Sequence, residues 1–345
     1  MASSLAPGQL SASYWRRITS PYSTPDFRRS ARQLSTAVAL FALSWAAMFF
    51  SLQVHYALTI ALAFPTAAFL VLLFMIQHDC GHGSYFKSRK LRDAVGFCIG
   101  VLTLTPYEYW RQTHAYHHSH SGDLDFRGFG DIDTLTVREY KVLPARRRFL
   151  YRLYRSPLVL LTIGPAFHFM LKHRYPWDVP RDWKSAWRGV WLTNLALALI
   201  LLVAHFTIGL KAFLMIQLPV SLIASSMGVL LFYVQHQYED SYWHRHDQWN
   251  YHEAALLGSS HLVLPKWLQW LTGNIGLHHV HHLSSQIPNY RLQECLDANP
   301  ELQVARQITI KDCIRLFGLT LWDEERRELI SFRQLRRHPN PSRSR

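Results

Sequence analysis

Histidine is concentrated in three short motifs of this 345-residue chain, and its spacing there is typical of metal ligands. Histidine is the commonest metal ligand in proteins and a frequent proton carrier, and the chain holds 20 of them. The motifs are HDCGH at 78–82, HAYHH at 114–118 and HHVHH at 278–282. Residues at i, i+3 and i+4 share one helical face. The second and third motifs therefore each direct three imidazoles toward one point, and the first directs two.

One further histidine, in the sequence QHQYED, follows directly after an apolar segment and brings the candidate ligands to nine. They are His78, His82, His114, His117, His118, His236, His278, His281 and His282. Nine ligands exceed the needs of one metal ion and suit two. Imidazole binds zinc, copper, iron and nickel, so the ligand type alone leaves the metal open.

Each motif also has a plainer interpretation when it is taken alone. A single HxxxH pair is common in helices that bind nothing, and one HxxHH motif is compatible with a solvated helix face. Two HxxHH motifs, one HxxxH pair and the additional histidine His236 together favour a metal centre. The four cysteines are scattered without CxxC spacing, which argues against a thiolate zinc site or a disulfide framework and favours a reducing compartment.

Acidic residues close to the motifs are candidates for a second task, since metal-binding histidines are normally oriented by hydrogen bonds to carboxylates or carbonyls. Each of them could equally be a solvated or ion-paired surface acid. The candidates are Asp79, Glu108, Asp123, Asp125, Glu239 and Asp240.

Four windows without charged residues are long enough to carry these motifs across a bilayer, at about 34–52, 56–77, 191–210 and 213–235. A helix of about 20 residues, rising about 1.5 Å per residue, spans the hydrocarbon layer. The connectors within each pair are very short, so we expect two helical hairpins. Shorter apolar stretches at 94–104 and 158–170 predict interfacial or buried helices. The fold class predicted is an all-α integral membrane protein with a helical cap.

Charge and parity predict one topology for this arrangement. An even number of spans separates the histidine motifs, so all of them emerge on one face of the membrane. Of the 37 lysines and arginines, only Lys211 lies in a hairpin connector. The positive-inside rule then places the motifs and both termini in the cytoplasm. The chain divides into a polar segment at 1–33, a membrane domain at 34–300 and a tail at 301–345, and we expect the first 30 residues and the last eight to be loosely ordered.

The formal net charge of +14 allows basic contacts with nucleic acid, with anionic lipid or with an acidic protein. The apolar windows favour the last two, so we expect membrane lipid and no nucleic acid as partners. Residues 1–30 lack the apolar centre of a cleavable signal peptide.

Taken together, the histidine motifs and the two hairpins resemble the membrane fatty acid desaturase superfamily over residues 40 to 300. The chain is most similar to bacterial methyl-end acyl-lipid desaturases of the delta-12, or omega-6, type. The three spacers of HDCGH are those of the acyl-lipid branch, and His278 stands where front-end desaturases usually have glutamine. Some animal-type enzymes have an asparagine ligand where this chain has Phe232. The HPGG motif of fused cytochrome domains is absent from the sequence.

The resemblance implies a non-haem diiron centre, held by the nine histidines, on a cytoplasmic cap over four helices. It implies O₂-dependent formation of a cis double bond in a long-chain fatty acyl group, lipid-bound or thioester, and favours the delta-12, or omega-6, position of an acyl lipid. Two electrons would come from an external donor such as a ferredoxin or a cytochrome. Iron suits the reaction because it is oxidised by O₂, whereas zinc has no redox chemistry. Location in a bacterial inner membrane is implied as well.

The acyl chain would need a tunnel lined by apolar and aromatic side chains, although core packing is the plainer role of each. The candidates are Tyr85, Tyr107, Trp110 and Tyr233. Two other functions stay open. The same scaffold serves hydroxylases, ketolases and acetylenases that act on alkyl, acyl or carotenoid substrates. A membrane metal transporter would also be rich in histidine, but transport needs polar ligands within the spans, and these spans are uncharged.

Overall fold

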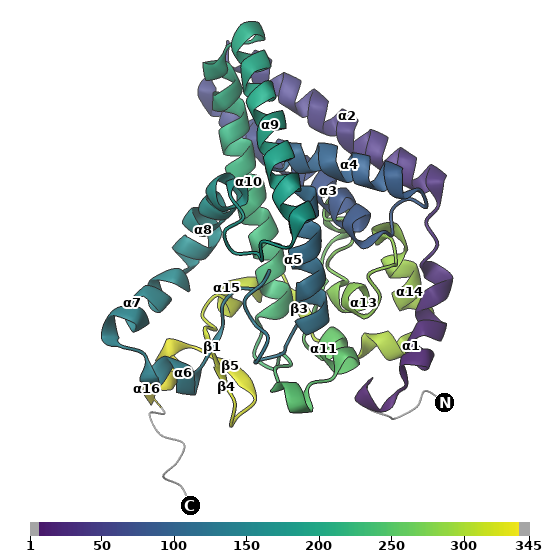
Figure 1. Ribbon diagram of the computed structural model, residues 1–345, viewed down its shortest axis with the longest axis vertical. Coiled ribbons are helices and arrows are strands. Elements are labelled where there is room, and N and C mark those ends of the chain that lie inside the picture. The colour runs from purple at the N-terminus through teal and green to yellow at the C-terminus, as the bar shows by residue number, and fades with distance from the viewer. Residues whose placement is uncertain (1–6, 338–345) are drawn as a thin grey trace, which may run out of the picture.

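Four long helices dominate the computed structural model, which describes residues 7–337 (Figure 1). They are α2 (Phe27–Ser51), α3 (Tyr56–His82), α9 (Lys184–Thr207) and α10 (Leu210–His236). Each is long and apolar enough to cross a membrane, which confirms the four predicted spans. The turns at residues 52–55 and 208–209 join them into two hairpins, and Gly209 adopts the left-handed conformation that the second turn requires.

The helices are longer than the apolar windows that predicted them. Helix α2 begins seven residues before its window because Asp26 caps its start, accepting a hydrogen bond from the backbone N–H of Arg29. Its first two turns therefore contain Arg28, Arg29 and Arg32, and α9 likewise contains Arg188. The predicted windows are free of basic residues, and these two helices extend beyond them into polar sequence.

Helix α3 is the central helix of the membrane region. More than half of its most apolar stretch, 56%, is buried inside the protein, against 17% for α2 and 22% for α9 and α10. It packs against α2, α10 and α4 (Arg89–Leu102), in a core that includes Leu72, Leu73 and Ile76. The other three helices therefore turn most of their apolar surface toward lipid, while α3 is held on several sides and provides a rigid support for its last turn.

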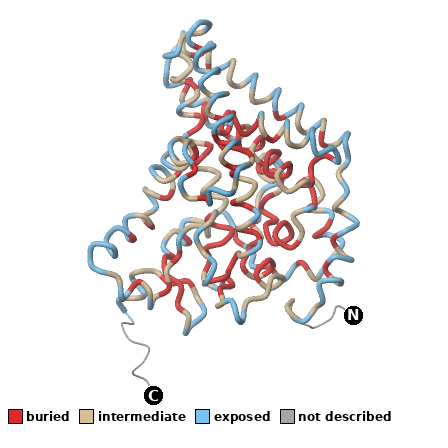
Figure 2. Tube along the Cα trace, in the orientation of Figure 1, coloured by how far each residue is buried: buried red, intermediate tan, exposed pale blue. Residues whose placement is uncertain are grey.

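Shorter elements form a cap at one end of the four helices, where buried residues are dense (Figure 2). Helix α5 (Tyr107–His120) lies along α3 and α9. The remaining helical elements are η1 (Pro7–Gln9), α1 (Ala12–Thr19), η2 (Ser20–Tyr22), α6 (Val137–Val142), α7 (Ala145–Tyr154), η5 (Lys172–Arg174), η6 (His246–Gln248), α11 (Tyr251–Leu257), α12 (Lys266–Leu271), α13 (His278–Leu283), η7 (Asn289–Arg291), α14 (Leu292–Ala298), η8 (Pro300–Val304), α15 (Cys313–Leu316) and α16 (Phe332–Arg337).

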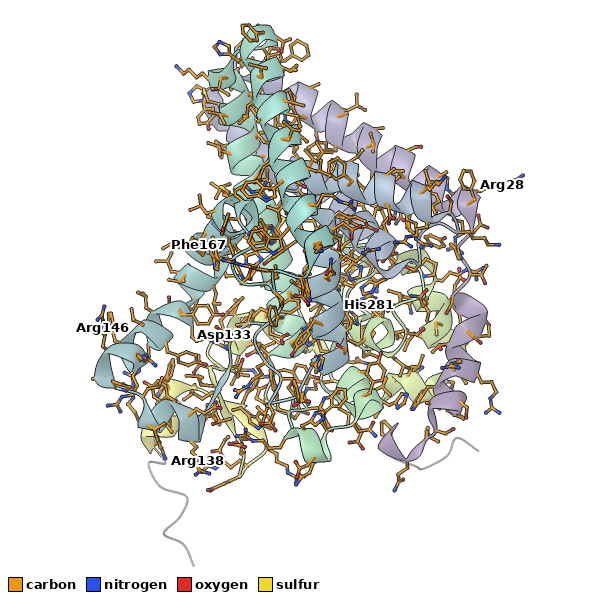
Figure 3. The ribbon with its side chains drawn as sticks, in the orientation of Figure 1. Arg28, Asp133, Arg138, Arg146, Phe167 and His281 are labelled. Carbon is orange, nitrogen blue, oxygen red and sulfur yellow. The ribbon has the colours of Figure 1, made fainter. Side chains whose placement is uncertain are left out.

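The apolar stretch predicted at 94–104 is helix α4, which is half buried against α3. The stretch predicted at 158–170 is a run of helical turns, formed by η3 (Val159–Ile163), α8 (Gly164–Ala166) and η4 (Phe167–Leu171). Two of these turns are π-helical, and Pro165, which has no N–H to donate, lies between them. Phe167 points away from the protein (Figure 3).

Two small sheets complete the cap, and both depend on the C-terminal segment. Strands β1 (Leu135–Thr136), β4 (Leu321–Asp323) and β5 (Glu328–Ile330) form one sheet, with β1 parallel and β5 antiparallel to β4. Strands β2 (His261–Val263) and β3 (Gln307–Thr309) pair in parallel. Strands of two or three residues leave no periodic pattern, so the sequence did not predict them.

Residues 7–30 are more ordered than expected. Helix α1 is capped by Ser11, and its Trp15 is 3% exposed, packed in a cluster with Leu256 and Leu296. The apolar face of α1 explains this, because burying one indole offsets the cost of ordering a short segment. Residues 1–6 and 338–345, which we also expected to be loosely ordered, lie outside the described part of the chain.

Candidate metal centre

The nine histidines come from four helices that end or lie side by side in the cap. His78 and His82 occupy the last turn of α3, which stops at Gly83 in the left-handed conformation (φ 81°). His236 is the last residue of α10. The second motif lies in the last two turns of α5, and the third forms most of α13. His281 marks the centre of the molecule in Figure 3.

The side chains converge into two groups, within each of which the candidate ligand nitrogens lie no more than 4.8 Å from one another. One group is His78, His82, His114, His118 and His281, and the other is His117, His236, His278 and His282. The two groups are adjacent, since the rings of His118 and His282 stack at 4.1 Å. Each HxxHH motif contributes histidines to both groups, so neither group is formed by a single motif. His279, the fourth histidine of HHVHH, belongs to neither group.

The nitrogen atoms at the centre face one another in a way that fits metal ions. Nε2 of His118 lies 3.1 Å from Nε2 of both His114 and His281, and Nε2 of His278 lies 2.9 Å from that of His236 and 3.1 Å from that of His282. A neutral imidazole nitrogen carries one proton or one lone pair, so no single arrangement of protons satisfies nitrogens that meet in threes.

Two further buried nitrogens, Nε2 of His82 and of His117, have no hydrogen-bond partner among residues 7–337. Unpaired buried polar atoms are costly, and a cation between the rings would satisfy them.

Burial keeps the imidazoles in the form that binds metal. Removal from water lowers the pKa of His114, His118, His278, His281 and His282 well below the usual value, and the neighbouring imidazoles lower it further. These side chains are therefore neutral at physiological pH, with a lone pair free for a cation.

Three of the candidate ligands have an acceptor on their outer nitrogen. Nδ1 of His78 lies 3.1 Å from Asp79 Oδ1, Nδ1 of His117 lies 2.5 Å from Asp131 Oδ1, and Nδ1 of His236 lies 3.1 Å from the carbonyl of Gly258. An acceptor there keeps the proton on Nδ1, so the lone pair is on Nε2 and points into the centre.

Of the acids that the sequence suggested for this task, Asp79 lies against a histidine of the centre. The others pair with basic side chains elsewhere: Glu108 with Arg111, Glu239 with Arg315, Asp240 with Arg306, Asp125 with Arg245 and Asp123 with His246. Sequence reasoning did not single out Asp131 or the Gly258 carbonyl. The acid-rich sequence DLDFRGFGDID after the second motif contained a signal for Asp131, but a loop has no period that would identify the acid that turns back.

The four aromatic candidates for an acyl tunnel lie in different surroundings. Trp110 stacks on His114 at 4.3 Å and also contacts Phe74 of α3. The hydroxyl of Tyr85 donates to the carbonyl of Ser30, and that of Tyr107 to Asp93. Tyr233 donates to the carbonyl of Leu319 in the C-terminal segment. Of the four, Trp110 is the one placed directly against the histidine centre.

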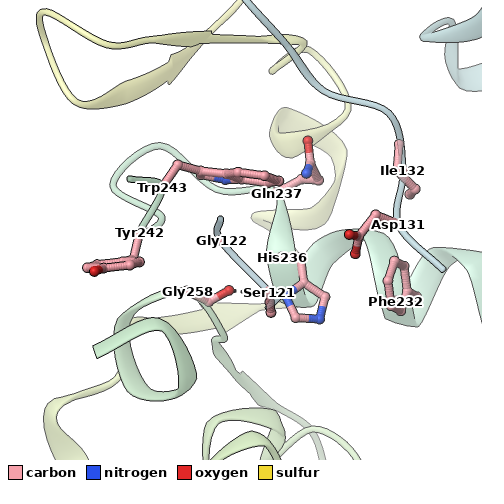
Figure 4. A pocket seen from close by; sticks show the side chains of 10 residues that line it. All are labelled: Ser121, Gly122, Asp131, Ile132, Phe232, His236, Gln237, Tyr242, Trp243 and Gly258. Carbon is pink, nitrogen blue, oxygen red and sulfur yellow. Dashed lines mark hydrogen bonds between the residues drawn. The ribbon is translucent and has the colours of Figure 1, made fainter. Parts of the chain in front are cut away.

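A small cavity of about 10 Å³, room for about one water molecule, lies beside His236 (Figure 4). Asp131 and Phe232 line it, and the Phe232 ring lies 5.1 Å from His117 and 5.0 Å from His236. Phe232 stands at the position where a related ligand set has asparagine, and its ring offers no ligand atom there.

Comparisons with known proteins bear on what this centre does. A family model described as fatty acid desaturase matches residues 55–310. A protein named fatty acid desaturase from Bacillus subtilis is 42% identical over 319 residues, which cover 92% of this chain and 90% of that protein. An sn-1 oleoyl-lipid 12-desaturase from Synechocystis is 28% identical, over 64% of this chain and 62% of its own length. An sn-2 acyl-lipid omega-3 desaturase (ferredoxin) from Helianthus annuus is 29% identical, over 66% of this chain and 52% of its own length.

Proposed function

The chain belongs to the fatty acid desaturase family, and from that premise we propose that it introduces a cis double bond at the delta-12, or omega-6, position of an acyl chain carried by a membrane lipid. The observation that carries this proposal is the convergence of nine imidazoles, most of them buried, into two adjacent groups. The names of the Synechocystis and Bacillus relatives support it, since the former desaturates oleoyl lipids at position 12.

We propose that each histidine group holds one iron ion. Two bound irons would supply the redox chemistry for removing two hydrogens from adjacent methylene groups, with O₂, two external electrons and two protons giving two molecules of water. Imidazole nitrogen suits iron, and zinc, which binds the same ligands, has no redox activity.

In this proposal the protein itself has three tasks: it orients the ligands, excludes water and positions the acyl chain. Asp79 and Asp131 keep the protons of His78 and His117 on Nδ1 and so aim Nε2 into the centre. Trp110 covers His114 and excludes water from that side. The packed helices hold the acyl chain at a fixed place, which matters because a displacement of about 1 Å can cost about 100-fold in rate.

The electron donor is proposed to be a separate protein of the ferredoxin or cytochrome type. The Helianthus relative has ferredoxin in its name, and a net charge of +14 favours an acidic partner. We place the centre and both termini in the cytoplasm of a bacterium, below its inner membrane, because basic residues crowd the end of the helices that carries the cap.

Expression of the chain in a host rich in oleate tests the reaction. We expect a new 18:2 species in the phospholipids, and we expect His117→Ala to abolish it while the protein still inserts in the membrane. A hydroxylated or triple-bonded product would identify the chain as one of the related diiron enzymes. Metal analysis of the purified protein tests the centre, with about two irons per chain expected.

A further inference from the structure

A groove of about 330 Å³ opens at the start of α2, on the end of the molecule that carries the histidines. We call it the arginine groove. It is lined by Arg29, Arg32, Gln33 and Thr36 of α2, by Trp270 of α12, and by Asn274 and Tyr290. Three segments distant in sequence, at 29–36, 270–274 and 290, thus contribute side chains to one concave surface.

The two arginines of the groove differ in their engagement. Arg29 is fixed, because it donates to Glu294 and to the carbonyl of Tyr290 at 2.7 Å each, and it lies over the Tyr290 ring. Arg32 is exposed, and within residues 7–337 no hydrogen bond or ion pair engages its guanidinium. The groove therefore offers one cation with free donors, and guanidinium donors match the oxygens of a phosphate.

The groove crosses the level at which the protein passes from water to hydrocarbon. Arg29 and Arg32 precede the apolar window of α2, which begins at residue 34, and Thr36 lies within it. Trp270 is 41% exposed on the opposite wall, and tryptophan is enriched at the membrane interface. A ligand in this groove would thus have its charged part beside Arg32 and its apolar part along the lipid-facing side of α2.

The wall of the groove is connected to the histidine centre through one residue. Nε2 of Gln33 donates to Oδ1 of Asn289, and Nδ2 of Asn274 donates to the backbone carbonyl of Asn289. Asn289 in turn donates twice to Oδ2 of Asp79, at 2.7 and 2.8 Å, and Asp79 contacts His78. The amides of the groove are therefore directed inward, and the groove and the centre share one hydrogen-bonded wall.

A second contact places the groove close to the ligands of α3. The turn before Asn274 lies so tightly on α3 that a Cβ at Gly273 would be 2.8 Å from Met75 Cβ. Met75 precedes His78 by three residues, which is less than one helical turn.

We propose that the arginine groove binds the phosphate headgroup of a membrane glycerophospholipid and so holds that lipid beside the wall that the groove shares with the histidine centre. This inference rests on the proposed function, and it identifies the lipid class that carries the acyl substrate. A phosphate on coenzyme A or free inorganic phosphate would offer the same oxygens to Arg32. The lipid is favoured because the groove opens at the boundary of the hydrocarbon layer. A soluble ligand would make no contact with the apolar part of the groove.

Equilibrium binding to the purified full chain tests the proposal without any need for activity. The protein is transferred from detergent to amphipol, and the Kd is measured for dioctanoyl phosphatidylglycerol and for dioctanoylglycerol, which lacks the phosphate. Arg32→Gln is expected to weaken phosphatidylglycerol binding about tenfold, as for loss of one charged hydrogen bond. Arg32→Lys should keep most of the affinity, and dioctanoylglycerol binding should be the same in all variants.

Arg28→Gln is the matched control, because Arg28 is exposed on the same helix and lies outside the groove (Figure 3). It should bind phosphatidylglycerol as the unchanged protein does. Wild-type affinity in Arg32→Gln overturns the proposal. So does displacement of the lipid by inorganic phosphate or coenzyme A at concentrations equal to that of the lipid. Failure of the desaturation itself would appear separately, as absence of a new double bond in a protein that still binds the lipid through Arg32.

Discussion

At the scale of single residues, hydrogen bonds at Nδ1 of the histidines determine how their rings are oriented toward the centre. Asp79 lies in the final turn of α3 and Asp131 lies in a loop, yet each carboxylate lies against the Nδ1 of a candidate ligand. Asp79 is itself held by two N–H groups of Asn289, whereas Asp131 borders a small cavity. The two groups of histidines thus have supports of different rigidity, and the support of His117 is the one more easily perturbed.

Replacing Asp131 by alanine should weaken metal binding without unfolding the cap. Loss of the acceptor frees the His117 ring to turn, and loss of such partners typically costs about 10- to 100-fold in metal affinity or activity. We expect Asp131→Asn to lose less, since its amide oxygen still accepts a hydrogen bond. Metal content and product yield measure both.

The control for this change is Asp125→Ala, which removes an acid of the same loop that pairs with Arg245 at the surface. It should retain metal and activity. Full metal content in Asp131→Ala would show that His117 needs no carboxylate to be oriented.

Acid should destabilise the metal-free protein through its buried histidines. Burial lowers the pKa of His114, His118, His278, His281 and His282 in the folded chain. An unfolded chain binds protons at these residues below about pH 6.5, while the folded chain does not, so stability is lost as the pH falls. Each histidine contributes up to about 1.4 kcal/mol per pH unit in that range.

The Tm of chelator-treated protein measures this effect between pH 7.5 and 5.5. We expect little change down to about pH 6.5 and a steep fall below it. Metal-loaded protein should hold its Tm to lower pH, because the cation competes with protons for the same nitrogens. A constant Tm in the metal-free protein down to pH 5.5 would mean that its histidines are already open to water.

At the scale of elements, prediction from sequence succeeded where the signal was local. The length of the apolar windows determines four spans, and the i, i+3, i+4 spacing determines which imidazoles share a helix face. Which histidine joins which group is not local. His117 and His118 are neighbours in sequence, but they point to different groups, because successive residues on a helix are turned by about 100°.

What the sequence could not predict depended on contacts between distant segments. Asp131 contacts His117, which lies 14 residues earlier, and the Gly258 carbonyl contacts His236, which lies 22 residues earlier. Strand β1 pairs with β4, which follows the second hairpin in sequence. None of these leaves a periodic pattern, since each is made by a single residue or a very short strand.

Close packing of α4 on the start of α5 should be sensitive to one methyl group. A Cβ at Gly96 would lie 2.4 Å from the ring of Tyr107, which is 2% exposed and has no room to withdraw. Gly96→Ala is therefore expected to cost about 1–3 kcal/mol by overpacking. Thermal unfolding in detergent measures it.

Gly228→Ala provides the matched comparison, because it also lies within a long helix and a Cβ there would meet nothing within 4 Å. It should leave the Tm unchanged or raise it slightly, since alanine favours a helix by about 1 kcal/mol. Equal stability of the two variants would show that Tyr107 can move.

A buried arginine joins the C-terminal segment to the rest of the cap. Arg155 is 1% exposed and donates to the carbonyls of Asp133 and Leu319 and to the side chain of Gln237, which follows His236. Arg155→Met should remove one charged donor from each of these acceptors, and a hydrogen bond to a charged group contributes about 1.5–3 kcal/mol. We expect faster hydrogen exchange in residues 319–330 and lower metal retention. Arg147→Met, an exposed change on α7, the helix that Arg155 follows, should alter neither.

At the scale of the whole molecule, the cap and the four helices form one structure with a strong charge asymmetry. The far ends of the helices carry one lysine or arginine, Lys211 in the first turn of α10, while the cap end carries the arginine groove and the basic face of α7. From this asymmetry the positive-inside rule predicts that the cap lies on the cytoplasmic side of the membrane. The same asymmetry would hold the cap against the anionic lipid of the cytoplasmic leaflet.

Cysteine labelling in intact cells tests that orientation. Cys98 and Cys313, the cysteines that are not buried, are first replaced by serine. Lys211→Cys, at an exposed position in the first turn of α10, should then react with a membrane-impermeant maleimide added outside the cytoplasmic membrane. Arg147→Cys, exposed on α7, should react only after the membrane is permeabilised. Labelling of Arg147→Cys in intact cells would place the cap outside the cytoplasm, where no reducing donor of the proposed type could reach the centre.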